Sequence, residues 1–96
     1  MRLIFTALAE HDLEAIGDYI AKDNPLRALS FLKELRQHCT RILDNPMGYR
    51  MRPEFGETIR SCAHGRYVVF YSATPSEVVI LRVIHGARDL GHEFAP

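Results

Sequence analysis

Hydrophobic and polar residues follow a helical period in the first third of the chain. The apolar positions of this stretch fall within one stripe about 100° wide: Ala9, Leu13, Ile16, Gly17 and Ile20. Residues 3–5 before it are apolar and predict a short strand, and Thr6 is suited to cap a helix. We therefore expect a helix from Thr6 to about residue 23. Gly17 costs about 1 kcal/mol relative to alanine inside a helix, and its place in the stripe predicts close approach of a second helix.

A second helical pattern follows the Asp23-Asn24-Pro25 break. Asn24 is the predicted N-cap and Pro25 occupies the first helical position, where its missing N–H does no harm. The pattern runs to about residue 44, before Asn45-Pro46. Its apolar positions cover about 160°, which is wider than one neighbour requires: Ala28, Leu29, Phe31, Leu32, Leu35, Cys39, Ile42 and Leu43. We expect this helix to contact both the first helix and a sheet.

The second half of the chain has the period of strands. Residues 47–57 show little periodicity and predict a loop, whereas residues 58–62, 67–72 and 78–85 predict three strands. Their short connections imply an antiparallel meander. The predicted fold class is α+β, with the order β-α-α-β-β-β and a helical hairpin packed on a small, mostly antiparallel sheet.

The last strand is apolar on both faces. In a regular strand Val78, Ile80 and Ile84 point to one side, and the residues between them point to the other. Two helices cover one face of such a sheet, so a second face remains, and monomers seldom leave a large apolar patch bare. We expect Val78, Ile80 and Ile84 to face a partner protein. The alternative is a curved sheet whose second face is shielded by the loop and the C-terminal residues.

Length and composition limit the broad class of protein. The chain has 96 residues and 11.0 kDa, which fits a single domain spanning residues 1–96, and 47% of its residues are hydrophobic. Twelve basic residues balance twelve acidic ones, so a role on nucleic acid must be focal. We interpret the start of the chain as a mature N-terminus, expect no membrane span, and place the protein in the cytoplasm. Cys39 and Cys62 are expected to be reduced.

Positive charge is concentrated in the second half of the chain. The stretch from Tyr49 to Arg88 contains six arginines and only three glutamates. Arginine binds two oxygens of a phosphate or carboxylate at once, so a focal basic surface is expected there. The five histidines lack the spacing of a metal site, and glycine-rich phosphate loops are absent from the sequence. We therefore expect neither a metal nor another cofactor.

The sequence resembles the ParE branch of the RelE/ParE toxin superfamily over nearly its whole length. The order and spacing of short motifs carry the resemblance: Asp12-Leu13, Ile16, Tyr19-Ile20, Asn24-Pro25, Asn45-Pro46, Gly48, Arg52-Pro53-Glu54, Gly56, Ile59-Arg60, Gly65, Tyr67-Val68-Val69-Phe70-Tyr71 and Ile80-Leu81-Arg82-Val83-Ile84-His85-Gly86-Ala87-Arg88-Asp89. The resemblance implies a β-α-α-β-β-β fold, neutralisation by a ParD-like antitoxin, and inhibition of DNA gyrase by protein contact.

The other branch of the superfamily cleaves messenger RNA on the ribosome, which requires a base, an acid and clustered cations. His85 is the candidate acid or base, with a structural hydrogen bond to a backbone carbonyl as its alternative. Nuclease relatives usually place a catalytic tyrosine or histidine near the C-terminus, where this chain has His92 and Phe94. They also tend to supply lysines or a glutamate before the second strand, where Glu54 could stand in but no lysine lies beyond Lys33. These departures favour a toxin that is not an enzyme. The nuclease and an inactive antitoxin-binding member remain as alternatives.

The residues expected to contact a partner or carry toxicity lie at the end of the sheet and in the C-terminal segment: Arg60, Arg82, His85, Arg88 and Phe94. For Arg82 the alternative is an internal ion pair with Glu77 or Asp89, and for Arg88 a local salt bridge with Asp89. We expect Arg82→Ala to weaken antitoxin affinity or toxicity more than the loss of Lys22 or Lys33.

Overall fold

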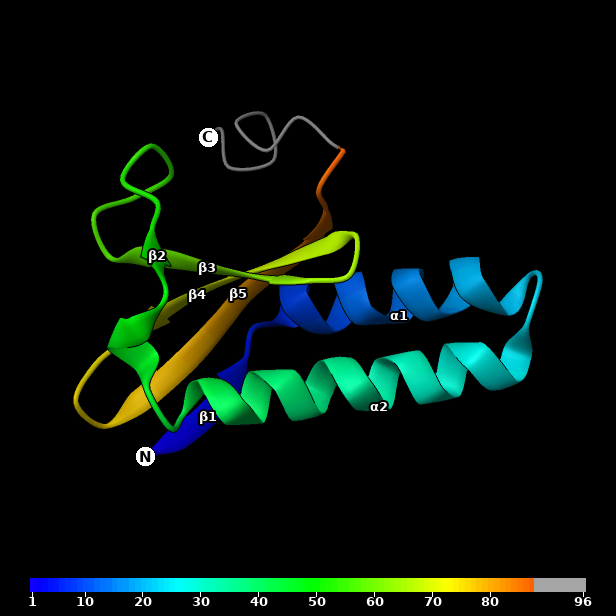
Figure 1. Ribbon diagram of the computed structural model, residues 1–96, viewed down its shortest axis with the longest axis horizontal. Helices are drawn as coiled ribbons and strands as arrows, with labels where there is room; N and C mark the ends of the chain where they lie inside the picture. The colour runs from blue at the N-terminus through cyan, green and yellow to red at the C-terminus, as the bar shows by residue number, and fades with distance from the viewer. Residues whose placement is uncertain (88–96) are drawn as a thin grey trace.

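The computed structural model describes residues 1–87, which form two helices packed against one face of a five-stranded sheet (Figure 1). The sheet has the strand order β1-β5-β4-β3-β2. In chain order the elements are β1 (Arg2–Phe5), α1 (Ala7–Ala21), α2 (Pro25–Ile42), the 3-10 turn η1 (Pro46–Gly48), β2 (Arg50–Met51), β3 (Ile59–His64), β4 (Tyr67–Ala73) and β5 (Glu77–His85). The predicted fold class is confirmed.

Both helices begin at the residues that the sequence predicts. The Thr6 hydroxyl accepts the backbone N–H of Ala9 at 3.0 Å, and the Asn24 side chain accepts that of Arg27 at 3.0 Å. Each cap satisfies one of the N–H groups that a helix start leaves unpaired. Each helix ends about two residues earlier than expected, where the backbone bonds shorten to three residues: the N–H of Asp23 donates to Ile20 after α1, and that of Asn45 donates to Ile42 after α2.

Gly17 allows the two helices to approach each other closely. A Cβ at this position would lie 2.8 Å from Cδ1 of Leu32 on α2, which is closer than real Cβ contacts. The predicted packing role of Gly17 is confirmed. The wide apolar arc of α2 also meets the sheet, as expected, since the Phe31 ring lies 5.6 Å from the Tyr67 ring of β4.

The sheet combines one parallel pair with an antiparallel meander. β1 pairs in parallel with β5 from Arg2↔Glu77 to Phe5↔Ile80, and β3, β4 and β5 are antiparallel neighbours. The loop predicted over residues 47–57 contains one short strand that the sequence pattern missed. This strand, β2, pairs with β3 through Arg50↔Ser61 and Met51↔Arg60.

A β-bulge in β5 changes which side chains face the helices. Tyr71 pairs with Ile80 but Phe70 pairs with Arg82, so Leu81 is the extra residue. Val78 and Ile80 lie in the core beneath the helices, where Val83 joins them, whereas Ile84 points to the opposite face. The prediction that Val78, Ile80 and Ile84 form one exposed face is therefore wrong. None of the three is more than 2% exposed.

The face of the sheet away from the helices is covered in part by the loop before β3. The Phe55 ring meets the Phe70 ring edge-on at 5.5 Å, and the Arg52 guanidinium lies over both rings, at 4.8 and 5.6 Å. Phe70 is wholly buried. The alternative in which the loop shields this face is thus what the structure shows around Phe70, and a bare sheet face no longer argues for a partner.

The core cluster joins side chains of α1, α2 and the strands β3, β4 and β5, and contains both free cysteines, Cys39 and Cys62. Neither helix within residues 1–87 combines the length and apolar character that a membrane span requires.

Candidate functional site

The ion pair between Asp12 and Arg82 connects α1 to β5. The Asp12 carboxylate accepts two hydrogen bonds from the Arg82 guanidinium, at 2.8 and 2.9 Å, and a third from the backbone N–H of Val83 at 2.9 Å. The sequence-based alternative, in which Arg82 forms an internal ion pair, is therefore confirmed, although with a different partner. The partner is Asp12 rather than Glu77, and Asp89 lies outside the described residues.

The start of α1 lies along the edge of β5 where β1 has ended. The backbone N–H of Thr6 donates to the carbonyl of Ile80 at 3.0 Å, and the Thr6 hydroxyl donates to that of Leu81 at 2.9 Å. Together with Asp12 these groups satisfy the strand edge beside the bulge, which would otherwise expose unpaired backbone groups. Arg82 thus helps to hold α1 against the sheet.

Arg60 positions the segment that precedes β2. Its Nη1 donates to the carbonyls of Met47 at 3.1 Å and Tyr49 at 2.8 Å. The Arg60 guanidinium therefore fixes a loop rather than facing Arg82. Because β4 lies between β3 and β5, the structure does not bring Arg60 and Arg82 into one cationic cluster.

His85 lies half-buried at the end of β5. Its Nδ1 accepts the backbone N–H of Ala87 at 3.1 Å, so the neutral ring carries its proton on Nε2. The ring also meets Tyr67 edge-on at 5.2 Å. A backbone contact was expected for this histidine, but with a carbonyl rather than with an N–H group. Arg88 and Phe94, the other two predicted residues, lie outside the described part of the chain.

A group of aromatic and histidine rings lies between α2 and the sheet, and sequence reasoning missed it. Phe31 of α2 contacts His64 of β3 at 5.4 Å and Tyr67 of β4 at 5.6 Å. His38 lies further along α2 than Phe31, and its Nδ1 is 2.8 Å from Nδ1 of His64. These residues are 26 or more positions apart between helix and strand, so the spacing along the chain carries no signal of the contact.

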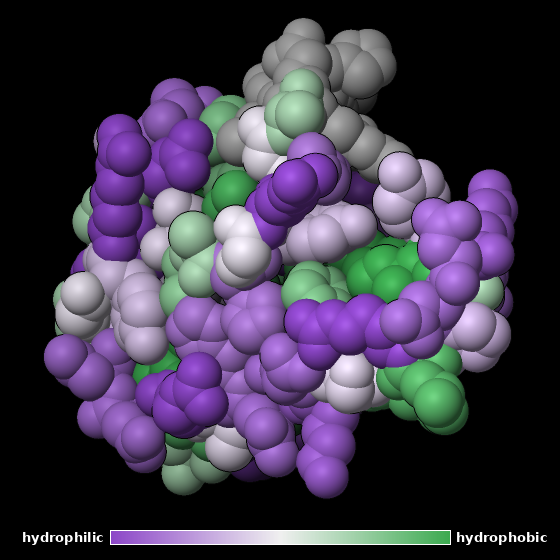
Figure 2. Space-filling view, turned by 45° about the vertical axis from the view of Figure 1, so that its right-hand side comes forward, coloured by the Kyte–Doolittle hydropathy of each residue, from purple (hydrophilic) through white to green (hydrophobic). Residues whose placement is uncertain are grey.

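The helical hairpin carries the exposed apolar side chains of the described region that lie near its turn, Tyr19, Leu26 and Leu29. Figure 2 turns this end of the molecule forward and shows apolar patches separated by hydrophilic side chains. A groove between the helices has an apolar lining of Ala7, Leu13 and Leu32. Its polar lining consists of Glu10, His11, Glu14 and Arg36.

Of the two glutamates that line this groove, Glu10 forms an ion pair and Glu14 is exposed to solvent. The Arg36 guanidinium binds Glu10 through two hydrogen bonds, at 2.8 and 3.1 Å, and these bonds lower the pKa of the Glu10 carboxyl. Glu14, one turn further along α1, is exposed. The groove therefore presents an apolar floor beside the exposed carboxylate of Glu14.

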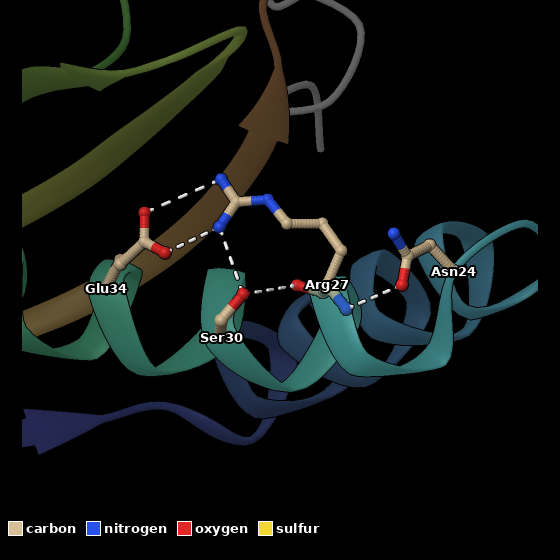
Figure 3. A network of polar contacts seen from close by, with 4 residues as sticks. All are labelled: Asn24, Arg27, Ser30 and Glu34. Carbon is tan, nitrogen blue, oxygen red and sulfur yellow. Dashed lines mark hydrogen bonds and ion pairs between the residues drawn. The ribbon is translucent and has the colours of Figure 1, made fainter.

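A second polar network lies on the outer surface of α2 (Figure 3). Arg27 donates to Glu34 at 2.6 Å and to the Ser30 hydroxyl at 3.0 Å, and its backbone N–H meets the Asn24 cap. The hydrogen bond from Arg27 lowers the pKa of the Glu34 carboxyl. Since both side chains are almost half exposed, the pair contributes little to stability.

Comparison with known proteins identifies similar sequences and folds. A family model described as the ParE toxin of the type II toxin-antitoxin system parDE matches residues 3–90. A solved structure of the chromosomal ParDE toxin-antitoxin system from P. aeruginosa superposes with a TM-score of 0.76 and 23% sequence identity, covering 88% of this chain and 95% of that one. No curated protein matches the sequence significantly.

Proposed function

Because the chain belongs to the ParE toxin family of type II toxin-antitoxin systems, we propose that it is the toxin of such a pair and is neutralised by a ParD-like antitoxin. The match over residues 3–90 is the observation that carries this proposal. We assign the whole chain to one toxin domain that acts in the cytoplasm. The similarity in fold to the ParDE structure supports the same view.

We propose DNA gyrase as the target, inhibited by protein contact without covalent chemistry. Such a toxin acts by binding one conformation of the enzyme better than the others, which requires a complementary surface rather than a catalytic group. RNA cleavage instead requires cations grouped around the reacting phosphate. Arg82 is engaged by Asp12, and Arg60 by two backbone carbonyls on the other side of β4. This arrangement favours contact over cleavage.

Among the residues predicted for toxicity, the structure suggests two kinds of role. We propose that His85, Arg88 and Phe94 contact the target, because they belong to the end of β5 and the segment after it. Arg60 and Arg82 act as positioning residues, since their guanidinium groups hold the loop before β2 and helix α1.

The groove between α1 and α2 is our proposed docking site for the antitoxin. This groove replaces the antitoxin-facing surface predicted from the sequence, because Val78 and Ile80 are buried and no partner reaches them in the folded chain. The apolar lining and the exposed carboxylate of Glu14 fit an antitoxin segment that carries apolar residues flanked by basic ones.

A supercoiling assay tests the proposed target directly. Purified toxin is added to gyrase and relaxed plasmid, with and without the cognate antitoxin, and we expect inhibition that the antitoxin reverses. Intact supercoiling together with cleavage of ribosome-bound messenger RNA would instead identify a nuclease. Normal growth of cells that express the toxin alone would identify an inactive, antitoxin-binding member.

A further inference from the structure

A hydrogen-bonded chain of three side chains joins α2 to β3. Nδ1 of His38 lies 2.8 Å from Nδ1 of His64, and Nε2 of the same His38 ring lies 3.1 Å from Sγ of Cys62. The two histidines are half-buried and Cys62 is buried. Both ring nitrogens of His38 therefore make contacts between the helical layer and the sheet.

The contact between the two Nδ1 atoms limits how many protons the pair can hold. A hydrogen bond needs one donor and one acceptor, so one Nδ1 must carry a proton while the other is bare. Two neutral rings satisfy this condition. One charged and one neutral ring satisfy it better, because a charged donor makes a stronger hydrogen bond. Two charged rings present two N–H groups to each other, and the bond is lost.

The surrounding charges decide which ring carries the first proton. Glu34, one turn before His38 on α2, interacts electrostatically with His64, while Arg41 on α2 acts on His38 and Cys62. Arg27 of α2 binds Glu34 and lies over the Phe31 ring, and Tyr67 of β4 meets the same ring beside His64. Burial and the nearby Arg41 disfavour a charge on the His38 ring.

We propose that His38 and His64 form an acid-sensitive clasp, which holds the C-terminal half of α2 on β3 while the pair carries at most one added proton and releases it when both imidazoles are charged. Burial, His64 and Arg41 all lower the pKa of His38, in agreement with this order of protonation. The clasp is a property of the folded chain and does not depend on the proposed target or antitoxin.

Nitrogen-15 NMR of the imidazole rings tests the order of protonation in the full chain. On acidification from pH 8, we expect His38 to stay neutral until the pair already holds one added proton. In His64→Gln the repulsion is removed, so His38 should titrate at a higher pH than in the wild type. His11→Gln, on the exposed side of α1, is the control and should leave His38 unchanged. An unchanged His38 titration in His64→Gln would overturn the proposal.

Amide hydrogen exchange of residues 37–42 tests the release itself. In the wild type we expect protection of these amides to fall as His38 becomes charged, after correction for the intrinsic pH dependence of exchange. In His38→Gln, which bonds His64 without acquiring charge, the acid-triggered loss should disappear. Full protection with both wild-type imidazoles charged would refute the clasp, and this measurement holds even where a variant fails to fold.

Discussion

The Asp12 carboxylate binds the guanidinium of Arg82 across 70 positions of sequence, with oxygen–nitrogen distances of 2.8 and 2.9 Å. The two side chains are only 11% and 16% exposed, and the same carboxylate accepts the backbone N–H of Val83. One acidic side chain of α1 therefore satisfies both an arginine and the edge of β5. Removal of Arg82 takes two hydrogen bonds from the Asp12 carboxylate, and removal of Asp12 takes the same two from Arg82 and leaves the Val83 N–H without this acceptor.

We expect Asp12→Ala and Arg82→Ala each to lower the free energy of unfolding by about 2–4 kcal/mol, because two charge-assisted hydrogen bonds between partly buried groups are lost and, for Asp12, the Val83 N–H also loses its acceptor. Urea denaturation at neutral pH measures this. The surface pair Arg27–Glu34 is the matched control, and its loss should cost less than about 1 kcal/mol. Equal effects at the two pairs would show that Asp12–Arg82 is no stronger than a surface contact. The loss of stability also gives a structural reason for Arg82→Ala to act more strongly on toxicity than changes at Lys22 or Lys33.

Tyr71→Phe should change the stability of the protein in alkali. Burial raises the pKa of Tyr71 to about 12, and its hydroxyl donates to the carbonyl of Pro46. A tyrosine ionises near pH 10 in the unfolded chain, so the folded state loses stability relative to it as the pH rises above about 10. We expect Tyr71→Phe to cost about 1 kcal/mol at pH 7.5 through the lost hydrogen bond and to show a smaller further loss at pH 10.5.

The control for this change is Tyr19→Phe, because Tyr19 is 68% exposed. Urea unfolding at pH 7.5 and 10.5 should show the wild-type alkaline loss in Tyr19→Phe. The same loss in Tyr71→Phe would mean that the buried hydroxyl is not its source.

Substitution of Gly17 tests the close approach of the helices. Gly17→Ala should change stability by less than about 1 kcal/mol, because the gain in helix propensity offsets the displacement of the Leu32 side-chain end. Gly17→Leu should cost about 1–3 kcal/mol by overpacking. Ala15→Gly on the exposed side of α1 measures propensity alone. Thermal unfolding that ranks Gly17→Leu equal to Gly17→Ala would contradict close packing at this position.

Reversal of charge beside the helical groove tests the proposed antitoxin site. We expect Glu14→Lys to weaken binding of the cognate antitoxin by roughly fivefold, since a basic segment would meet a like charge. Titration calorimetry at two salt concentrations measures this, and the effect should shrink at the higher one. Glu57→Lys, an exposed change in the loop, is the control. Unchanged affinity in Glu14→Lys would exclude this groove edge from the interface.

The sequence alone determined the elements that depend on neighbouring residues. Thr6 and Asn24 cap the helices where predicted, Pro25 opens the second helix, and the apolar period of 3.6 identifies the faces that meet at Gly17. Capping and periodicity act over one or two turns, so a linear pattern contains all of the information they need.

Only the tertiary structure decided the contacts between distant parts of the chain. The single extra residue at Leu81 reverses the alternation of β5 and sends Ile84 to the opposite face from Val78 and Ile80. A bulge depends on the neighbouring strand, and a regular period of two gives no sign of it. The pairing of Asp12 with Arg82, and of His38 with His64, likewise depends on how the helical layer settles on the sheet. Side chains from separate elements meet only after that packing is complete, so the sequence alone does not predict these partners.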